Sequence, residues 1–119
     1  MVTVQGKAYT ARRAVARAVV TLPPLAATAL ADSQHSLSQK GDALSVAQLA
    51  GILASKRTSE LIPLCHQVPL DVCLVDIRTE DNCSRVVIDC EARATHATGV
   101  EMEAMVGAST AALTMFAFF

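Results

Sequence analysis

The residues best suited to chemistry in this chain gather in the stretch from Lys56 to His66. Lys56 and Arg57 carry full positive charge and several hydrogen-bond donors, which suits the binding of a phosphate group. Cys65 and His66 add a thiol and an imidazole, the groups that nucleophilic and acid–base catalysis use. Because a proline stands on either side of this pair, we expect a loop that presents its side chains rather than a regular helix.

Cys65 and His66 also have purely structural interpretations. Sequence neighbours in an extended backbone point to opposite sides, so the pair alone does not favour a nucleophile and base of the thiol-protease kind. Cys65 is equally explained as a small buried apolar side chain, and His66 as a surface or capping histidine.

A second polar cluster, Lys40-Gly41-Asp42, precedes this stretch. One anion pocket could be formed by Lys40, Lys56 and Arg57 together with Arg12 and His66. The alternative is that each lysine is simply solvated near a helix end. The chain has neither a GxxxxGK nor a GxGxxG motif, so a glycine-rich phosphate loop is not expected.

A third cluster runs from Thr98 to Glu103. Thr98-x-x-Glu101 matches a capping box, which would make Glu101 a structural residue. Glu103 stands among apolar residues and is harder to explain as scaffold. A carboxylate near a helix start, facing basic groups across a cleft, could act in acid–base chemistry.

Length and composition exclude several classes of protein. The 119 residues fit one domain, and the 52% of apolar residues ensure a buried core. The net charge of −1 gives no basic field for nucleic acid, and the four cysteines lack the CxxC spacing of a zinc site. Residues 1–31 are basic without an acid, which fits a transit peptide or, as we favour, a strand with a basic face.

Hydrophobic periodicity predicts a strand, two helices, two strands and a helix. The second helix follows an N-cap at Asp42, places Val46, Leu49, Ala50 and Leu53 on one face, and carries Lys56 and Arg57 near its end. A change of apolar phase at Leu74-Val75 favours a bulge or a strand buried on both faces, and Asp81-Asn82 predicts a turn. The expected elements span 14–22, 25–31, 42–57, 68–77, 86–94 and 102–118, with a polar loop at 32–39.

These elements indicate an α+β domain in which helices pack on an antiparallel sheet. The last helix is apolar on nearly all sides, so we expect it to be mostly buried, in part against another subunit. A tail anchor over residues 104–119 is the membrane alternative, although this stretch is short for a span.

Three motifs together resemble the MoaC family, the cyclic pyranopterin monophosphate synthases of molybdenum cofactor biosynthesis. They are Lys-Gly-Asp-Ala, Ala-Ser-Lys-Arg-Thr-Ser-Glu-Leu-Ile-Pro-Leu-Cys-His and Thr-Gly-Val-Glu-Met-Glu-Ala-Met. The resemblance implies a ferredoxin-like subunit in a homohexamer, a trimer of dimers, with the active site between subunits. It also implies conversion of 3′,8-cyclo-7,8-dihydroguanosine 5′-triphosphate into cyclic pyranopterin monophosphate with release of pyrophosphate.

By position, the resemblance makes Lys40, His66 and Glu101 the catalytic candidates. The substrate-binding candidates are Arg12, Lys56, Leu64, Cys65, His66, Met102 and Glu103. It implies no resident cofactor or protein-bound metal, although Mg²⁺ could accompany the triphosphate. No nucleic-acid or membrane partner is expected. The compartment would be the cytoplasm of a bacterium or the mitochondrial matrix of a eukaryote.

The chain also departs from the family pattern. Ala117 stands where the family has an active-site Asp, and Thr3 stands where it has another Asp. The sequence ends at Phe119, before a pocket lysine, a further strand and a Lys- and Gly-rich tail. We therefore expect a single domain over 1–119 that lacks the family's C-terminal segment and is weakly active or inactive. The alternative function is a non-catalytic member that binds the nucleotide or assembles with intact subunits.

Overall fold

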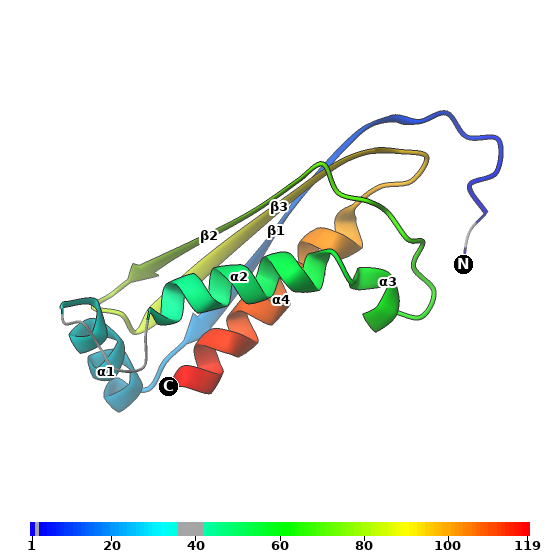
Figure 1. Cartoon of the computed structure of the whole chain (residues 1–119). Helices are drawn as coiled ribbons and strands as arrows, with labels where there is room; N and C mark the ends of the chain where they lie inside the picture. Colours follow the sequence, from blue (N-terminus) through cyan, green and yellow to red (C-terminus); the bar gives the residue numbers. More distant parts are fainter. Residues whose placement is uncertain (2, 36–41) are drawn as a thin grey trace.

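The structure is a computed structural model that describes residues 1, 3–35 and 42–119. Its seven elements form an elongated molecule with principal extents of 53 × 23 × 23 Å. They are β1 (Thr10–Thr21), α1 (Pro24–His35), α2 (Ala43–Ser55), α3 (Thr58–Leu61), β2 (Val72–Glu80), β3 (Arg85–His96) and α4 (Glu101–Phe118). Figure 1 shows α2 and α4 lying along the same side of the sheet, with α1 at one end and α3 at the other.

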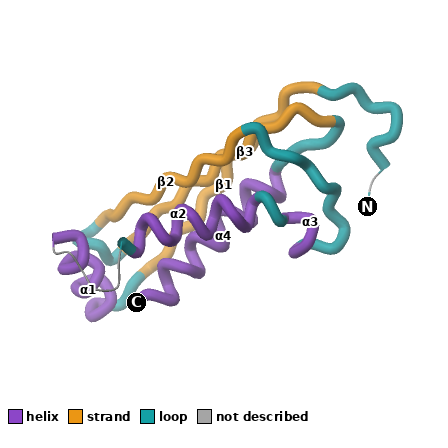
Figure 2. Tube along the Cα trace, viewed as in Figure 1, coloured by secondary structure: helices purple, strands orange, loops and turns teal. Residues whose placement is uncertain are grey.

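The three strands form one antiparallel sheet in the order β1-β3-β2. The central strand β3 pairs with β1 from Thr10↔His96 to Thr21↔Arg85. The hairpin of β2 and β3 turns at residues 81–84, where Asp81, Asn82 and Cys83 have positive φ. This arrangement confirms the α+β, ferredoxin-like class and the turn predicted from the sequence (Figure 2).

The core lies between the sheet and the pair of long helices. Side chains of β3 alternate between this core and the open face of the sheet, as the sequence pattern predicted. Ile88 and Cys90 are fully buried on the helix side, and Met115 covers them from α4. The helix side of β1 contributes mostly small residues to this core, Ala16 and Ala18 beside Val20, so the helices can lie close to the sheet.

The predicted bulge at Leu74-Val75 is absent. The pairing of β2 with β3 runs without interruption from Val72↔Arg93 to Glu80↔Arg85. Val75 is buried under the helices, whereas Leu74 lies exposed on the open face. The change of apolar phase therefore reflects a leucine on the outer face of an edge strand, and not an inserted residue. The alternative of a strand buried on both faces is also wrong.

The second helix buries a different face from the one expected. Asp42 caps it as predicted, accepting a hydrogen bond from the amide of Leu44 at 3.1 Å. The buried residues are small, however: Ala43, Ala47, Gly51 and Ser55. The bulky residues expected to mark the core face, Val46, Leu49 and Leu53, are exposed.

Close packing against α4 explains this reversal. A β-carbon added at Gly51 would stand 2.8 Å from the carbonyl oxygen of Gly107, and one at Gly107 would overlap Ser55 and Cys90. The two backbones can approach this closely only where both helices present small residues. The larger side chains of α2 must therefore face away from α4.

One further expectation needs correction, whereas the expected burial of α4 in part by another subunit stays a prediction. Helix α1 continues to His35, so the polar loop predicted at 32–39 does not begin at Asp32. Helix α4 buries one long side but exposes Met105, Leu113 and Phe116, so a single chain does not cover it on most sides. Among the helices of the described residues, none is long and apolar enough to cross a membrane.

We predict that Gly51→Ala destabilises the protein by about 1–2 kcal/mol. Overpacking against a backbone carbonyl, which cannot swing aside, costs about 2–3 kcal/mol, in the upper part of the range for core overpacking, and the better helix propensity of alanine offsets about 1 kcal/mol of it. Urea unfolding of both proteins measures the difference. Ser109→Ala on the exposed side of α4 is the control and should change stability by less than about 0.5 kcal/mol. A Gly51→Ala protein as stable as the original would contradict the close crossing.

Candidate functional site

An open pocket of about 210 Å³ lies where the loop after α3 meets the start of α4. Figure 1 shows these two segments side by side at the end of the molecule opposite α1. The loop and the helix start are the two segments that the sequence singled out for chemistry. The lining residues are Leu64, Cys65, His66, Val68, Thr98, Gly99, Glu101, Met102 and Glu103.

The loop side of the pocket is shaped by the short helix α3. The hydroxyl of Thr58 donates to the carbonyl of Ser55 at 2.9 Å, which fixes α3 to the end of α2. A turn then follows, in which the amide of Cys65 donates to the carbonyl of Ile62 at 3.2 Å. Because the chain turns here and is not extended, Cys65 and His66 both line the pocket. No hydrogen bond between the Cys65 and His66 side chains is found among the described residues.

The helix side of the pocket lacks the predicted capping box. The N-cap of α4 is Val100, and no side chain caps it. The carboxylate of Glu101 instead folds back over Gly99, where a β-carbon would overlap it. Thr98 is thereby free to line the pocket. The Glu101 carboxylate can occupy this position only because Gly99 has no side chain.

Glu103 is a buried carboxyl, with only 3% of its surface exposed. The hydroxyl of Ser55 donates to its carbonyl at 2.8 Å, which ties this first turn of α4 to the end of α2. Burial raises the pKa of Glu103 above its ordinary value, and the nearby carboxylate of Glu101 raises it further. Glu103 is therefore suited to hold a proton that an exposed glutamate would release.

The predicted cationic residues stand apart from this pocket. Arg12 donates to the carbonyl oxygens of His96 at 3.1 Å and Ala97 at 3.2 Å, so it supports the loop that leads to Thr98. Lys56 is exposed at the C-cap of α2. Neither side chain lines the pocket. Lys40 lies outside the described residues.

Six of the predicted site residues thus meet in one pocket: Leu64, Cys65, His66, Glu101, Met102 and Glu103. Sequence reasoning missed Val68 and Gly99 as lining residues and assigned Thr98 to a cap. Each is within three positions of a predicted site residue, so proximity in the chain was the available signal. The described lining contains two carboxyls and one imidazole but no lysine or arginine.

A larger hollow of about 560 Å³ lies elsewhere, between β1 and α4. Its described lining is apolar apart from two hydroxyl residues and holds no group that titrates near neutral pH. The residues are Ala18, Val19, Val20, Thr21, Ser109, Ala112, Leu113 and Phe116. Proton transfer is therefore better placed in the smaller pocket.

Comparison with known proteins gives a consistent result over the whole sequence. The family model described as "MoaC family" matches residues 1–119. The cyclic pyranopterin monophosphate synthase of Geotalea uraniireducens is 47% identical over 116 residues, which are 98% of this chain and 71% of that protein. The protein of the same name from Xanthomonas oryzae is 47% identical over 118 residues, covering 98% and 69%. Molybdenum cofactor biosynthesis protein 1 of Mus musculus is 48% identical over 116 residues, covering 98% and 18%.

The raised pKa of Glu103 predicts a pH dependence of stability. The folded state holds this proton more tightly than the unfolded state, so the stabilisation is complete below the ordinary glutamate pKa of about 4.3 and declines as pH rises through the higher folded pKa. In Glu103→Gln, the free energy of unfolding should no longer show this decrease with rising pH. Urea unfolding between about pH 4 and pH 8 measures this decrease. Glu60→Gln, at an exposed carboxylate on α3, should keep it. An unchanged pH profile in Glu103→Gln would contradict a protonated Glu103.

Proposed function

The chain belongs to the MoaC family, and from this premise we propose that it is a cyclic pyranopterin monophosphate synthase, a lyase of molybdenum cofactor biosynthesis. The observation that carries this proposal is the single pocket formed by Leu64, Cys65 and His66 with Glu101, Met102 and Glu103. Two motifs far apart in the sequence, both of which pointed to this family, meet there. An acid–base reaction can use the carboxyls and the imidazole that they bring together.

The substrate in this proposal is 3′,8-cyclo-7,8-dihydroguanosine 5′-triphosphate. It becomes cyclic pyranopterin monophosphate, and pyrophosphate leaves as the cyclic phosphate closes. The reaction needs groups that exchange protons and cations that hold the triphosphate. Lys40, His66 and Glu101 are assigned to proton exchange, because amino, imidazole and carboxyl groups are common acids and bases in enzymes. Glu103 lines the same pocket, and because burial raises its pKa, its carboxyl can hold a proton to higher pH than an exposed glutamate.

The remaining candidates serve binding. Leu64, Cys65 and Met102 offer apolar and sulfur contacts along the pocket wall. Arg12 and Lys56 are assigned to the phosphates, because guanidinium and ammonium groups match phosphate charge. The Arg12 guanidinium already donates hydrogen bonds to the carbonyl oxygens of residues 96 and 97, so its first effect is to position that loop.

A shared site between subunits follows from where the charges lie. A triphosphate requires several cations, whereas the described pocket lining supplies none apart from His66. Ala117, at the family's active-site Asp position, is separated from Glu101 by almost the whole of α4. At a rise of about 1.5 Å per residue this is roughly 24 Å. This separation supports a site in which one end of α4 from each of two copies lies near one substrate.

We propose a homohexamer, a trimer of dimers, as the working form. Exposed apolar side chains on three elements support this assembly: Leu49 on α2, Leu113 and Phe116 on α4, and Val15 on β1 are each about half exposed or more. Exposed apolar side chains thus occur both on the helices and on the open face of the sheet, and each is a candidate for burial between subunits. No nucleic-acid or membrane partner enters the proposal.

No resident cofactor or protein-bound metal is part of the proposed reaction. Mg²⁺ enters only as a companion of the triphosphate, whose oxygens are the ligands that this ion prefers. The reaction would take place in the cytoplasm of a bacterium or in the mitochondrial matrix of a eukaryote. These assignments follow the family.

Turnover of the cyclic nucleotide by the purified chain tests the function, with the product oxidised to a fluorescent pterin and quantified. We expect turnover that falls roughly 10²–10⁴-fold in His66→Ala and in Glu101→Gln, because each removes an acid–base group. Glu60→Gln, an exposed carboxylate outside the pocket, should leave the rate unchanged.

Binding of the nucleotide, measured by calorimetry, separates the alternatives. Binding without turnover would favour the non-catalytic member, for which Ala117 is the specific observation. If the chain shows no binding of the nucleotide and no turnover, both functions are contradicted.

Sedimentation analysis of the full chain tests the assembly. Six copies of the 12.5 kDa chain are expected at concentrations that support turnover. An active monomer would contradict a site shared between subunits, whatever its rate.

A further inference from the structure

Two cysteine side chains touch each other beneath the crossing of α2 and α4. The Sγ atoms of Cys73 on β2 and Cys90 on β3 are 4.0 Å apart. Cys73 pairs with Ala92 and Cys90 pairs with Val75, so the two cysteines are diagonal neighbours on the helix-facing side of the sheet. Two thiols in van der Waals contact are placed to form a bond, in contrast to a single buried cysteine.

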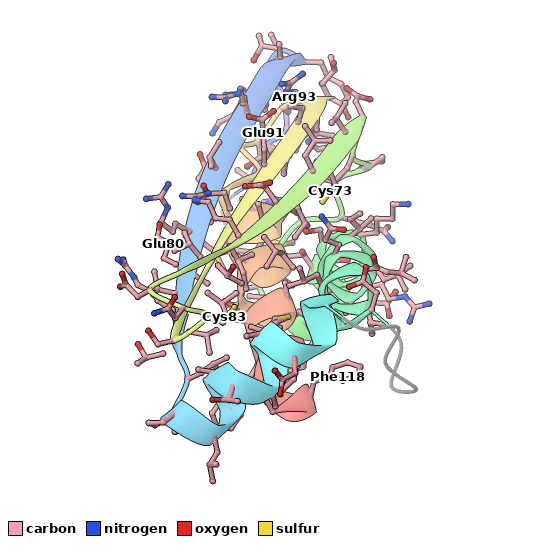
Figure 3. The ribbon with its side chains drawn as sticks, turned by 90° about the vertical axis from the view of Figure 1, so that its left-hand side faces the viewer. Cys73, Glu80, Cys83, Glu91, Arg93 and Phe118 are labelled. Carbon is pink, nitrogen blue, oxygen red and sulfur yellow. The ribbon has the colours of Figure 1, made fainter. Side chains whose placement is uncertain are left out.

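The two thiols differ in exposure and in neighbours. Cys90 is fully buried, with the hydroxyl of Ser55 3.8 Å from its Sγ and Gly107 packed against it. Cys73 is partly exposed on the outer strand of the sheet, on the side where α2 lies (Figure 3). A solution oxidant can therefore reach Cys73 but not Cys90.

We propose that Cys73 and Cys90 form a redox-active dithiol that a hydroperoxide converts into a reversible disulfide. The inference does not depend on the proposed synthase activity, and neither thiol lines the pocket assigned to it. Cys73 is the sulfur that meets the oxidant, and Cys90 is the resolving sulfur.

The chemistry proceeds in two balanced steps. The Cys73 thiolate attacks one oxygen of hydrogen peroxide, the O–O bond breaks, and a sulfenic acid and hydroxide result. The Cys90 sulfur then attacks the sulfenic sulfur, the S–S bond forms, and the sulfenic oxygen leaves as water with the thiol proton. Two thiols are oxidised and one peroxide is reduced to two waters. A small dithiol reverses the change by thiol–disulfide exchange.

The electrostatics of the pair assign these roles. A hydrogen bond from Cys90 lowers the pKa of Cys73 to about 6, with help from Ser55 and the charge of Lys56. The same contact with a charged Cys73, together with burial, raises the pKa of Cys90. Cys73 therefore carries the nucleophilic thiolate and Cys90 keeps its proton. Once Cys73 becomes a neutral sulfenic acid, the Cys73 thiolate charge that kept the proton on Cys90 is gone.

Disulfide formation should also change the structure at the candidate site. The two sulfurs must approach from contact to a bond of about 2.05 Å, which moves Cys90 away from Ser55. Ser55 is the residue that holds the carbonyl of Glu103. Diagonal strand neighbours are spaced widely for a disulfide, so the bond would be strained and easily reduced.

The test uses the full chain, reduced and then treated with graded hydrogen peroxide. After acid quenching, free thiols are alkylated and the disulfides are mapped by peptide mass spectrometry. We expect a single Cys73–Cys90 disulfide, formed at one peroxide per bond and reversed by dithiothreitol. Hydrogen exchange at the first turn of α4 should become faster on oxidation.

Variants assign the two sulfurs. Cys90→Ser should stop at a Cys73 sulfenic acid, which dimedone traps, and Cys73→Ser should leave Cys90 reduced. Cys83→Ala, in the β2–β3 turn, should still form the disulfide. Peptide mapping of the unaltered chain needs no variant, so the disulfide can still be tested if a variant fails to fold. Oxidation of Cys65 or Cys83 ahead of Cys73, or a Cys73 oxidised without a disulfide, would overturn the proposal.

Discussion

The close crossing of α2 over α4 is the contact on which the rest of the molecule depends. Gly51 and Gly107 meet there without side chains, so the two backbones approach more closely than larger residues allow. That approach lets the Ser55 hydroxyl reach both the Glu103 carbonyl and the Cys90 thiol. The start of α4, and with it the candidate pocket, is therefore positioned by glycines about one helical turn from Ser55 in α2 and from Glu103 in α4.

The same crossing accounts for the apolar surface of the subunit. A helix that presents its small residues to its neighbour must turn its large residues elsewhere, and Val46, Leu49 and Leu53 are exposed for this reason. Fully burying one such side chain is worth about 1.5–3 kcal/mol. A chain with these exposed leucines and valines would gain stability if a partner covered them, which agrees with the proposed assembly.

Sequence reasoning predicted the elements that local chemistry decides. The alternation along β3, the turn at Asp81 and Asn82, and the cap at Asp42 are all consequences of neighbouring residues, and they appear as expected. The buried face of α2 could not be predicted, because hydrophobic periodicity cannot tell a core from an interface. The pocket residues were predicted from two motifs, but the separation of Lys56 and Arg12 from that pocket depends on tertiary packing.

The distribution of charge explains why the pocket carboxyls remain available. Within the described residues, the ion pairs lie among side chains of the strands, as in the pairs of Asp89 with Arg17 and Arg78. There the hydrogen bond from Arg17 holds the pKa of Asp89 at about 2. Glu103 has no such partner among the described ion pairs, so burial dominates and its pKa rises. A cation delivered by a second subunit or carried with the substrate would oppose that burial. Assembly of the site and release of the Glu103 proton are therefore linked by the same electrostatics.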